Sequence, residues 1–132
     1  MTVEVERIQN VPLFADFTEA QYGAIAEKFE EREARVGEHL SSEGGAGYFF
    51  FVIERGGAVV TRGDETLATF GPGDFFGEGT IFRARRRTAT VTATEPSVVF
   101  AMFGADFAKL VGDIPELHAR IDDALDARLP AD

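Results

Sequence analysis

The chain has 132 residues, a length that predicts one domain with a single hydrophobic core. Its formal net charge of −10 disfavours binding to nucleic acid or to an anionic membrane. It contains no cysteine and no run of 18 apolar residues, so we expect no thiolate metal site, no membrane-spanning helix and a cytoplasmic location.

The first predicted element is a helix that begins at a capping box. The Thr18 hydroxyl and the Gln21 amide can each satisfy a backbone N–H group that the helix start leaves unpaired. Four apolar residues then follow at the spacing of one helical face, namely Tyr22, Ile25, Ala26 and Phe29. We expect this helix to end within the charged stretch 30–35, and the helical part of the chain to span residues 1–33.

Short strands separated by glycine-containing turns are predicted for residues 34–103. Segments 58–61 and 66–70 flank a predicted hairpin turn at 62–65, and 71–74 is a second predicted turn. Residues 88–94 alternate between small apolar side chains and threonines, as expected for a strand with one buried face. In the run 49–51 only alternate phenylalanines can face one side, so we expect the run to supply barrel core and neighbouring surface.

The C-terminal part, residues 104–130, is predicted to return to helix. Phe107, Leu110 and Val111 form a short apolar turn, and Asp113 opens a helix that has Pro115 in its first turn. The segment presents an apolar face that could cover the mouth of the strand region, formed by Phe107, Leu110, Leu117, Ile121 and Leu125. The predicted fold class is therefore α+β and mainly β: one domain, 1–132, in which a β-roll of the jelly-roll type is flanked by N- and C-terminal helices.

The most informative segment for function is residues 76–90, which read Phe-Gly-Glu-Gly-Thr-Ile-Phe-Arg-Ala-Arg-Arg-Arg-Thr-Ala-Thr. The Glu78 carboxylate can accept hydrogen bonds from hydroxyl groups, and the Arg87 guanidinium can hold a phosphate. A glycine-flanked turn between them could direct backbone N–H groups at the same anion. The combination indicates a site for a ribose phosphate. The neighbouring Arg83, Arg85 and Arg86 are expected to be mainly solvated and to raise the local concentration of anions.

From about residue 11 to residue 129 the chain resembles a cyclic nucleotide-binding domain, the module of catabolite activators, cyclic-nucleotide-dependent kinases and cyclic-nucleotide-gated channels. The resemblance rests on the opening 11–14 before a capped helix, on the glycine pattern of 71–78, and on the spacing of Glu78, Arg87 and Ala89. It implies a cyclic mononucleotide ligand, cAMP or cGMP, and no other cofactor.

The resemblance also implies roles for individual residues. Glu78 would accept hydrogen bonds from the ribose 2′-hydroxyl, and Arg87 would pair with an exocyclic oxygen of the cyclic phosphate. Thr88 would contact the purine or the phosphate through its hydroxyl, with cAMP the default ligand and cGMP a close alternative. Ala89 is small enough to let the strand backbone approach the ligand.

The remaining predicted site residues lie where the family uses a short helix N-terminus to bind the phosphate: Gly77, Gly79, Thr80 and Ile81. Gly79 departs from the family, which usually has leucine or isoleucine there. Because that side chain helps to connect the ligand to the C-terminal helices, its absence predicts a weaker relay, carried instead by Ile81 and Phe82. No output segment follows the last helix, so we expect a stand-alone domain.

Catalysis and metal binding are not predicted. The two histidines, His39 and His118, cannot form a metal cluster of the cupin type, and no serine or threonine stands in a nucleophile motif. Two hypotheses follow. In the first the chain is a sensor that binds a cyclic nucleotide and signals to a protein partner that the sequence does not identify, as a monomer or a homodimer. In the second it is a degenerate domain of the same fold that serves only protein–protein contact, and Glu78 with Arg87 is an ordinary surface ion pair.

Overall fold

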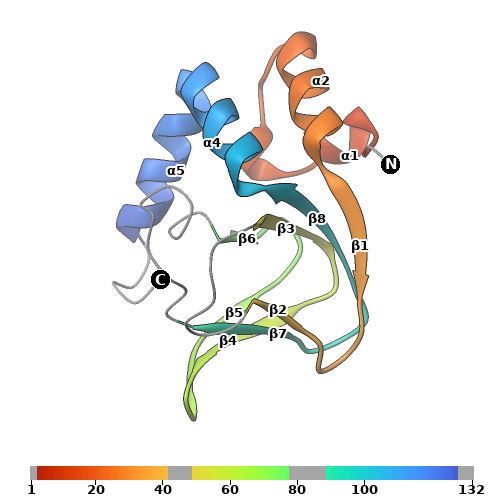
Figure 1. The fold of residues 1–132 in the computed structure, drawn as a ribbon, viewed down its shortest axis with the longest axis vertical. Helices are drawn as coiled ribbons and strands as arrows, with labels where there is room; N and C mark the ends of the chain where they lie inside the picture. The colour runs from red at the N-terminus through yellow and green to blue at the C-terminus, as the bar shows by residue number, and fades with distance from the viewer. Residues whose placement is uncertain (1–2, 42–48, 78–88, 128–132) are drawn as a thin grey trace.

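The computed structural model describes residues 3–41, 49–77 and 89–127 (Figure 1). The helical elements lie at the two ends of the chain and are α1 (Val5–Gln9), η1 (Pro12–Phe14), α2 (Glu19–Lys28), α4 (Gly104–Asp113) and α5 (Pro115–Ala127). The strands between them are β1 (Glu30–Ala34), β2 (His39–Ser41), β3 (Phe49–Arg55), β4 (Ala58–Arg62), β5 (Glu65–Phe70), β6 (Phe75–Phe76), β7 (Thr90–Ala93) and β8 (Ser97–Phe103). The predicted class, a β-roll flanked by helices, is confirmed.

The strands form two four-stranded antiparallel sheets that face each other. The first sheet has the order β1-β8-β3-β6 and the second the order β2-β7-β4-β5. In Figure 1 the helices gather on the side of the first sheet that points away from the second sheet. Within the described part of the chain, no helix is both long and apolar enough to cross a membrane. The predicted hairpin is present, because β4 and β5 pair on either side of the turn at 63–64.

Strand β3 is buried on both faces, because the two sides of the first sheet carry different cores. Phe50 and Val52 point into the core that the sheet shares with the helices, and Phe51 and Ile53 point into the interior of the roll. On the helical side, Phe50 stacks on Phe107 of α4 with 4.0 Å between the ring centroids. The expectation that the phenylalanine run reaches the surface is therefore wrong for Phe50, because helices cover the outer face of the sheet.

The boundary between helix and strand lies earlier than predicted. Helix α2 ends at Lys28, and β1 begins at Glu30, four residues before the expected start of the roll. Residues 30–34 form an edge strand that pairs with β8, and of these five only Ala34 is buried. The three glutamates of β1 therefore remain exposed while the backbone pairs, and charges on an edge strand also discourage pairing with other chains.

The C-terminal helices also differ from the prediction. Residues 104–113 form the complete helix α4 rather than a short turn, and Asp113 is its last residue instead of the cap of the next helix. The start of α5 is organised by Ile114, whose carbonyl accepts hydrogen bonds from the backbone N–H groups of Leu117 and His118.

The apolar face of α4 and α5 covers the outer side of the first sheet and not the mouth of the roll. The described members of this face are fully part of the core formed with α1 and α2: Phe107, Leu110, Leu117 and Ile121. The physical reason is that the outer sheet face presents large apolar side chains such as Phe100, which are stabilised only when helices exclude water from them. The side chain of Leu125 lies outside the described residues.

One ion-pair cluster ties α1 to the first sheet. Arg7 donates from Nε to Glu54 Oε2 of β3 at 2.7 Å, and its Nη2 also contacts Glu54 Oε1 and lies 2.6 Å from Glu31 Oε1 of β1. Its guanidinium stands 5.0 Å from the centre of the Phe100 ring. The hydrogen bond from Arg7 lowers the pKa of Glu54 below its ordinary value near 4.5, against the opposing effect of burial, and the same bond raises the pKa of Arg7.

We predict that Glu54→Gln destabilises the fold by about 1–2 kcal/mol at neutral pH, because a charge-assisted bidentate contact is replaced by a neutral one. A depressed carboxyl pKa contributes stability that is present above about pH 4.5 and is lost as the pH falls through the folded pKa of Glu54. The difference between wild type and variant in urea unfolding should therefore shrink from pH 7 to pH 3. Glu31→Gln is the matched control, since the Glu31 side chain is 43% exposed and should contribute less. A difference that stays constant over this pH range would contradict the assignment.

Candidate functional site

Two of the eight predicted site residues belong to the part of the chain that the structure describes. Gly77 and Ala89 belong to the described residues, whereas the other six lie outside them: Glu78, Gly79, Thr80, Ile81, Arg87 and Thr88. The described part of the candidate site therefore consists of its two ends and the walls around them.

Gly77 directly follows β6, and its backbone has a positive φ of 95°. This is the left-handed region, where glycine is favoured because a side chain would crowd the following carbonyl. The preceding Phe76 lies opposite Phe51 of β3, so the chain leaves the first sheet at a fixed point. A glycine here can turn the chain away from the sheet at little steric cost.

The turn at 71–74 fixes the approach to Gly77. The carboxylate of Asp74 accepts a hydrogen bond from the Gly71 N–H group at 2.8 Å. The backbone of Ile53 in β3 then bonds to both sides of the turn, accepting from the Gly73 N–H group and donating to the Asp74 carbonyl, each at 2.8 Å. The predicted turn is thus confirmed, and it anchors the start of the candidate segment to β3, the strand that is buried on both faces.

Ala89 marks the other end of the candidate segment. It is half-buried, packs against the interior core of the roll, and directly precedes β7, which pairs with β4 and β2. Val91 and Ala93 of β7 are buried while Thr90 and Thr92 are half-buried, so the predicted alternation is confirmed. Residues 78–88 consequently connect the first sheet, at β6, with the second sheet, at β7.

Aromatic rings line the interior of the roll beside Gly77. Neighbouring ring centroids are 5.7 Å apart for Phe70 and Phe76, 4.9 Å for Phe76 and Phe51, 6.0 Å for Phe51 and Phe49, and 5.0 Å for Phe49 and Phe103. From Phe76, directly before Gly77, the row therefore continues to Phe103, directly before α4.

Sequence reasoning missed the end of this row. Phe103 shares one face of β8 with Val99 and Ala101, a period of two that residues 97–103 display. Its partner Phe49 could be found only from the register between β3 and β8. Arg32 of β1 was missed as well, although its guanidinium lies 4.3 Å from the centre of the Phe49 ring.

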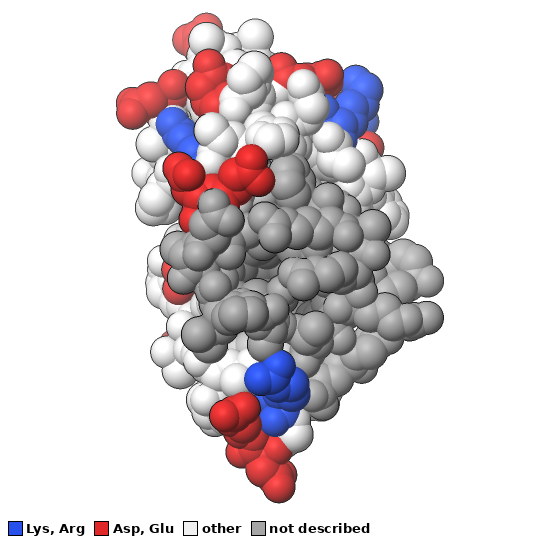
Figure 2. Space-filling view, turned by 90° about the vertical axis from the view of Figure 1, so that its left-hand side faces the viewer, with Lys and Arg blue, Asp and Glu red and all other residues white. Residues whose placement is uncertain are grey.

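The charges of the described residues are unevenly distributed. Figure 2 shows that acidic side chains predominate at the helical end of the face in view, and that the opposite tip, where the β4–β5 hairpin lies, carries both signs. At that tip Arg62 is paired with Glu65 at 3.7 Å. Among the described residues, no group of three or more His, Cys, Asp or Glu is placed to hold a metal ion.

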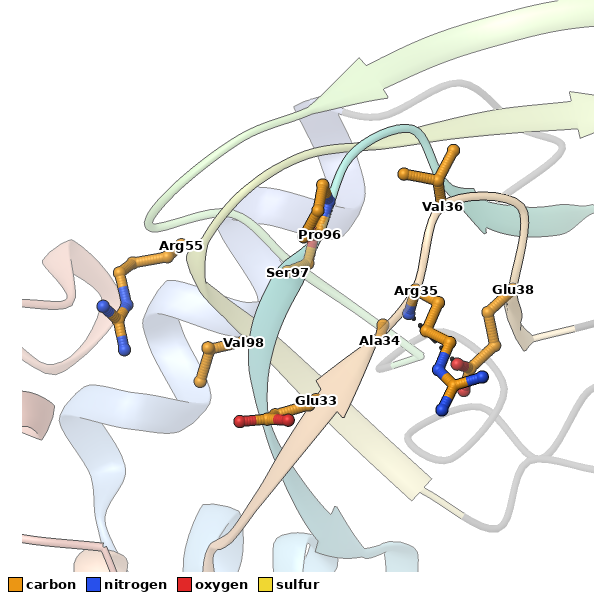
Figure 3. A pocket seen from close by; sticks show the side chains of 9 residues that line it. All are labelled: Glu33, Ala34, Arg35, Val36, Glu38, Arg55, Pro96, Ser97 and Val98. Carbon is orange, nitrogen blue, oxygen red and sulfur yellow. Dashed lines mark hydrogen bonds between the residues drawn. The ribbon is translucent and has the colours of Figure 1, made fainter.

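A hollow of about 640 Å³ lies at the other end of the roll, beside the end of β1 and the start of β8 (Figure 3). Two arginines and two glutamates border it, but in Figure 3 the Arg35 and Arg55 side chains lie apart and do not converge on one point. The Glu38 carboxylate already accepts a hydrogen bond from the backbone N–H group of Arg35 at 3.1 Å. The hydroxyl of Ser97 bonds to Glu95 and Gly57. The hollow therefore lacks a convergent set of polar groups and is not the candidate site.

Comparison with known proteins identifies the family of the chain. The family described as cyclic nucleotide-binding domain matches residues 31–113. A cAMP-dependent protein kinase regulatory subunit of Hypocrea atroviridis is 28% identical over 113 residues, covering 86% of this chain and 24% of that protein. The cGMP-dependent protein kinase, isozyme 1, of Drosophila melanogaster is 33% identical over 124 residues, covering 88% of this chain and 16% of that protein. The chain thus spans about a quarter or less of the length of these relatives.

The fold has a similar counterpart among solved structures. The regulatory subunit of a cAMP-independent protein kinase A from Trypanosoma brucei superposes with a TM-score of 0.86 at 18% identity, covering 96% of this chain and 45% of that one. This likeness concerns the fold alone. The family match spans more than half of the chain, and the family is one of regulatory rather than catalytic domains. This protein therefore belongs to the cyclic nucleotide-binding domain family.

Proposed function

We propose that the chain, as one domain in the cytoplasm, binds cAMP or cGMP between Gly77 and Ala89 and signals to a protein partner through α4 and α5. One observation carries the proposal. The segment contains a carboxylate and a guanidinium nine positions apart. It starts at a glycine of positive φ directly after β6 of the first sheet, and it ends at a small residue that packs against the roll core directly before β7 of the second sheet. Membership of the family supports a cyclic nucleotide as the ligand class of that segment.

Each group in the segment would recognise a different part of the ligand. Glu78 would accept the ribose 2′-hydroxyl proton, and Arg87 would form a charge-assisted bond to an exocyclic phosphate oxygen. Backbone N–H groups at Gly79, Thr80 and Ile81 would add donors to the same phosphate. Thr88 would contribute a hydroxyl to base recognition, which permits cGMP without requiring it, so cAMP remains the first ligand to test.

The signal would leave through the C-terminal helices, which the described structure holds on the N-terminal segment. Arg120 of α5 donates from Nη1 to the Leu13 carbonyl at 2.7 Å, and its guanidinium lies 4.8 Å from the centre of the Phe17 ring. A ligand can shift these helices only if it binds two arrangements with different affinity. Release of the Arg120 contacts is therefore a step that any large movement of α5 would require.

The second candidate function is protein contact without nucleotide. It is favoured by Gly79, which removes the aliphatic side chain expected after Glu78, and by the close fold similarity to a regulatory subunit described as cAMP-independent. Titration calorimetry with cAMP and cGMP separates the two candidates, because only the sensor predicts saturable binding.

Arg87→Ala should weaken cAMP binding by about 30-fold or more, since it leaves a phosphate charge without its partner in a closed site. Arg85→Ala and Arg86→Ala are matched controls that remove the same charge from neighbouring positions, and we expect each to change the dissociation constant by less than about 3-fold. Calorimetry on the three variants makes the comparison. Equal losses in all three would show that net charge, and not a specific contact, holds the phosphate.

Glu78→Gln should weaken cAMP binding by about 10-fold and leave 2′-deoxy-cAMP binding almost unchanged, because the carboxylate matters only where a hydroxyl can donate to it. Measuring both ligands on both proteins gives the coupling between the side chain and the hydroxyl directly. A parallel loss for the two ligands would mean that Glu78 supports the shape of the segment and does not contact the ribose.

Arg120→Gln should loosen α5, because it removes the charged hydrogen bond to the Leu13 carbonyl. We expect amide hydrogen exchange in residues 115–124 to accelerate about 10-fold in the nucleotide-free protein. Lys109→Gln is the control, since its partner Asp113 lies on the same helix and both side chains are more than half exposed. If exchange in α5 is the same in wild type and Arg120→Gln, the guanidinium does not hold the helix.

A further inference from the structure

Phe103 is an exposed aromatic residue at the end of a strand. It is the last residue of β8, directly precedes α4, and is 60% exposed. Among the described residues only one other large apolar side chain is similarly exposed, Val36 at 63%, and Val36 borders the hollow at the other end of the roll.

Helix capping does not account for this phenylalanine. Phe103 occupies the N-cap position of α4, and no side-chain hydrogen bond caps the helix. Serine, threonine, aspartate and asparagine are strongly preferred there because their side chains accept from the unpaired N–H groups of the first turn. The position therefore carries both a poor cap and an exposed ring.

One face of the Phe103 ring is supported. The ring stacks on Phe49 with 5.0 Å between centroids and 28° between planes. Phe49 in turn contacts Phe51 and lies against the Arg32 guanidinium, whose carbon is 4.3 Å from the ring centre. Phe103 as a whole is 60% exposed, so its ring is supported by Phe49 and is also open to solvent.

The register places this surface at the same end of the roll as the start of the candidate segment. Phe51 lies opposite both Phe76 of β6 and Ala101 of β8, and Phe49 lies opposite Phe103. Because β6 and β8 are both antiparallel to β3, the chain that continues from Phe76 to Gly77 runs toward the end where Phe103 stands.

We propose that Phe103 is a base-stacking residue, and that its exposed ring face receives the purine of the bound cyclic nucleotide. The inference rests on the proposed function. A flat aromatic surface suits this ligand because every base has a π-face, and stacking on aromatic side chains tolerates both adenine and guanine. Phe103 would then contribute affinity for either base, and Thr88 would determine the selectivity between adenine and guanine.

A protein partner fits the same surface less well. Protein interfaces use contiguous apolar patches, and among the described residues Phe103 has no exposed large apolar neighbour, since Val36 lies at the other end of the roll. A single supported ring matches the size of one base.

The test compares three ligands on three proteins by calorimetry. The ligands are cAMP, cGMP and the base-free methyl riboside 3′,5′-cyclic phosphate, and the proteins are wild type, Phe103→Ser and the control Val36→Ser. Phe103→Ser should lose about 10-fold or more in affinity for both nucleotides and nothing for the base-free ligand. Val36→Ser should bind all three ligands like wild type.

Phe103→Ser also separates stacking from a structural role. A serine at this position can cap α4, so the urea midpoint should change little although the contact with Phe49 is lost. Phe103→Leu is the second variant, because it keeps an apolar side chain without a π-face and should lose affinity for both nucleotides as well. Because the chain has no tryptophan, Phe103→Trp gives a single reporter, whose emission should change with cAMP and not with the base-free ligand.

The outcomes are distinguishable. If wild type binds neither nucleotide, the proposed function fails and the stacking role fails with it. If wild type binds and Phe103→Ser binds equally well, only the stacking role is overturned. Equal losses for the nucleotides and the base-free ligand would likewise overturn it, because the contact would then not involve the base.

Discussion

The structure depends on the burial of strand β3 on both of its faces. Phe50 and Val52 point toward the helices, and Phe51 and Ile53 point into the roll, so one strand belongs to two cores. Since successive side chains of a strand point in opposite directions, a slip of one residue would exchange the two cores completely. The pairing of β3 with β8 therefore determines which side chains pack against the helices and which line the candidate site.

A hydrogen-bonded corner between the turn after β3 and the start of β8 holds that register at the C-terminal end of β3. Gly56 follows the strand with a positive φ of 96°, and an added side chain there would collide with Ser97. The buried Ser97 hydroxyl accepts from the Gly57 N–H group at 3.1 Å and donates within the same turn, which links the end of β3 to the start of β8. Once this corner is fixed, the antiparallel pairing continues to Phe49 and Phe103 at the opposite end, where the candidate segment begins.

Turns and strand alternation, which depend on neighbouring residues, could be predicted from the sequence. Features that depend on pairing with a distant strand could not. The hairpin turn at 62–65, the turn at 71–74 and the alternation of β7 depend on neighbouring residues, and all three are present. Strand β1 was missed because its charged residues resemble a helix end, and only pairing with β8 makes it a strand. The candidate site is similar, since Gly77 and Ala89 could be named from a motif, whereas Phe103 depends on the β3–β8 register.

The net charge of −10 adds a constraint on how such a site can bind an anion. The long-range field of an acidic protein repels a cyclic nucleotide, but charges beyond about 8–10 Å are largely screened at physiological ionic strength. In the proposed site, affinity would then come from short-range donors, namely Arg87 and backbone N–H groups. Such contacts are sensitive to small displacements, so both ends of the segment need firm anchors. The bonds between the 71–74 turn and Ile53 anchor one end, and the pairing of β7 with β4 anchors the other. In this chain the two sheets would therefore govern phosphate affinity as much as the arginine itself.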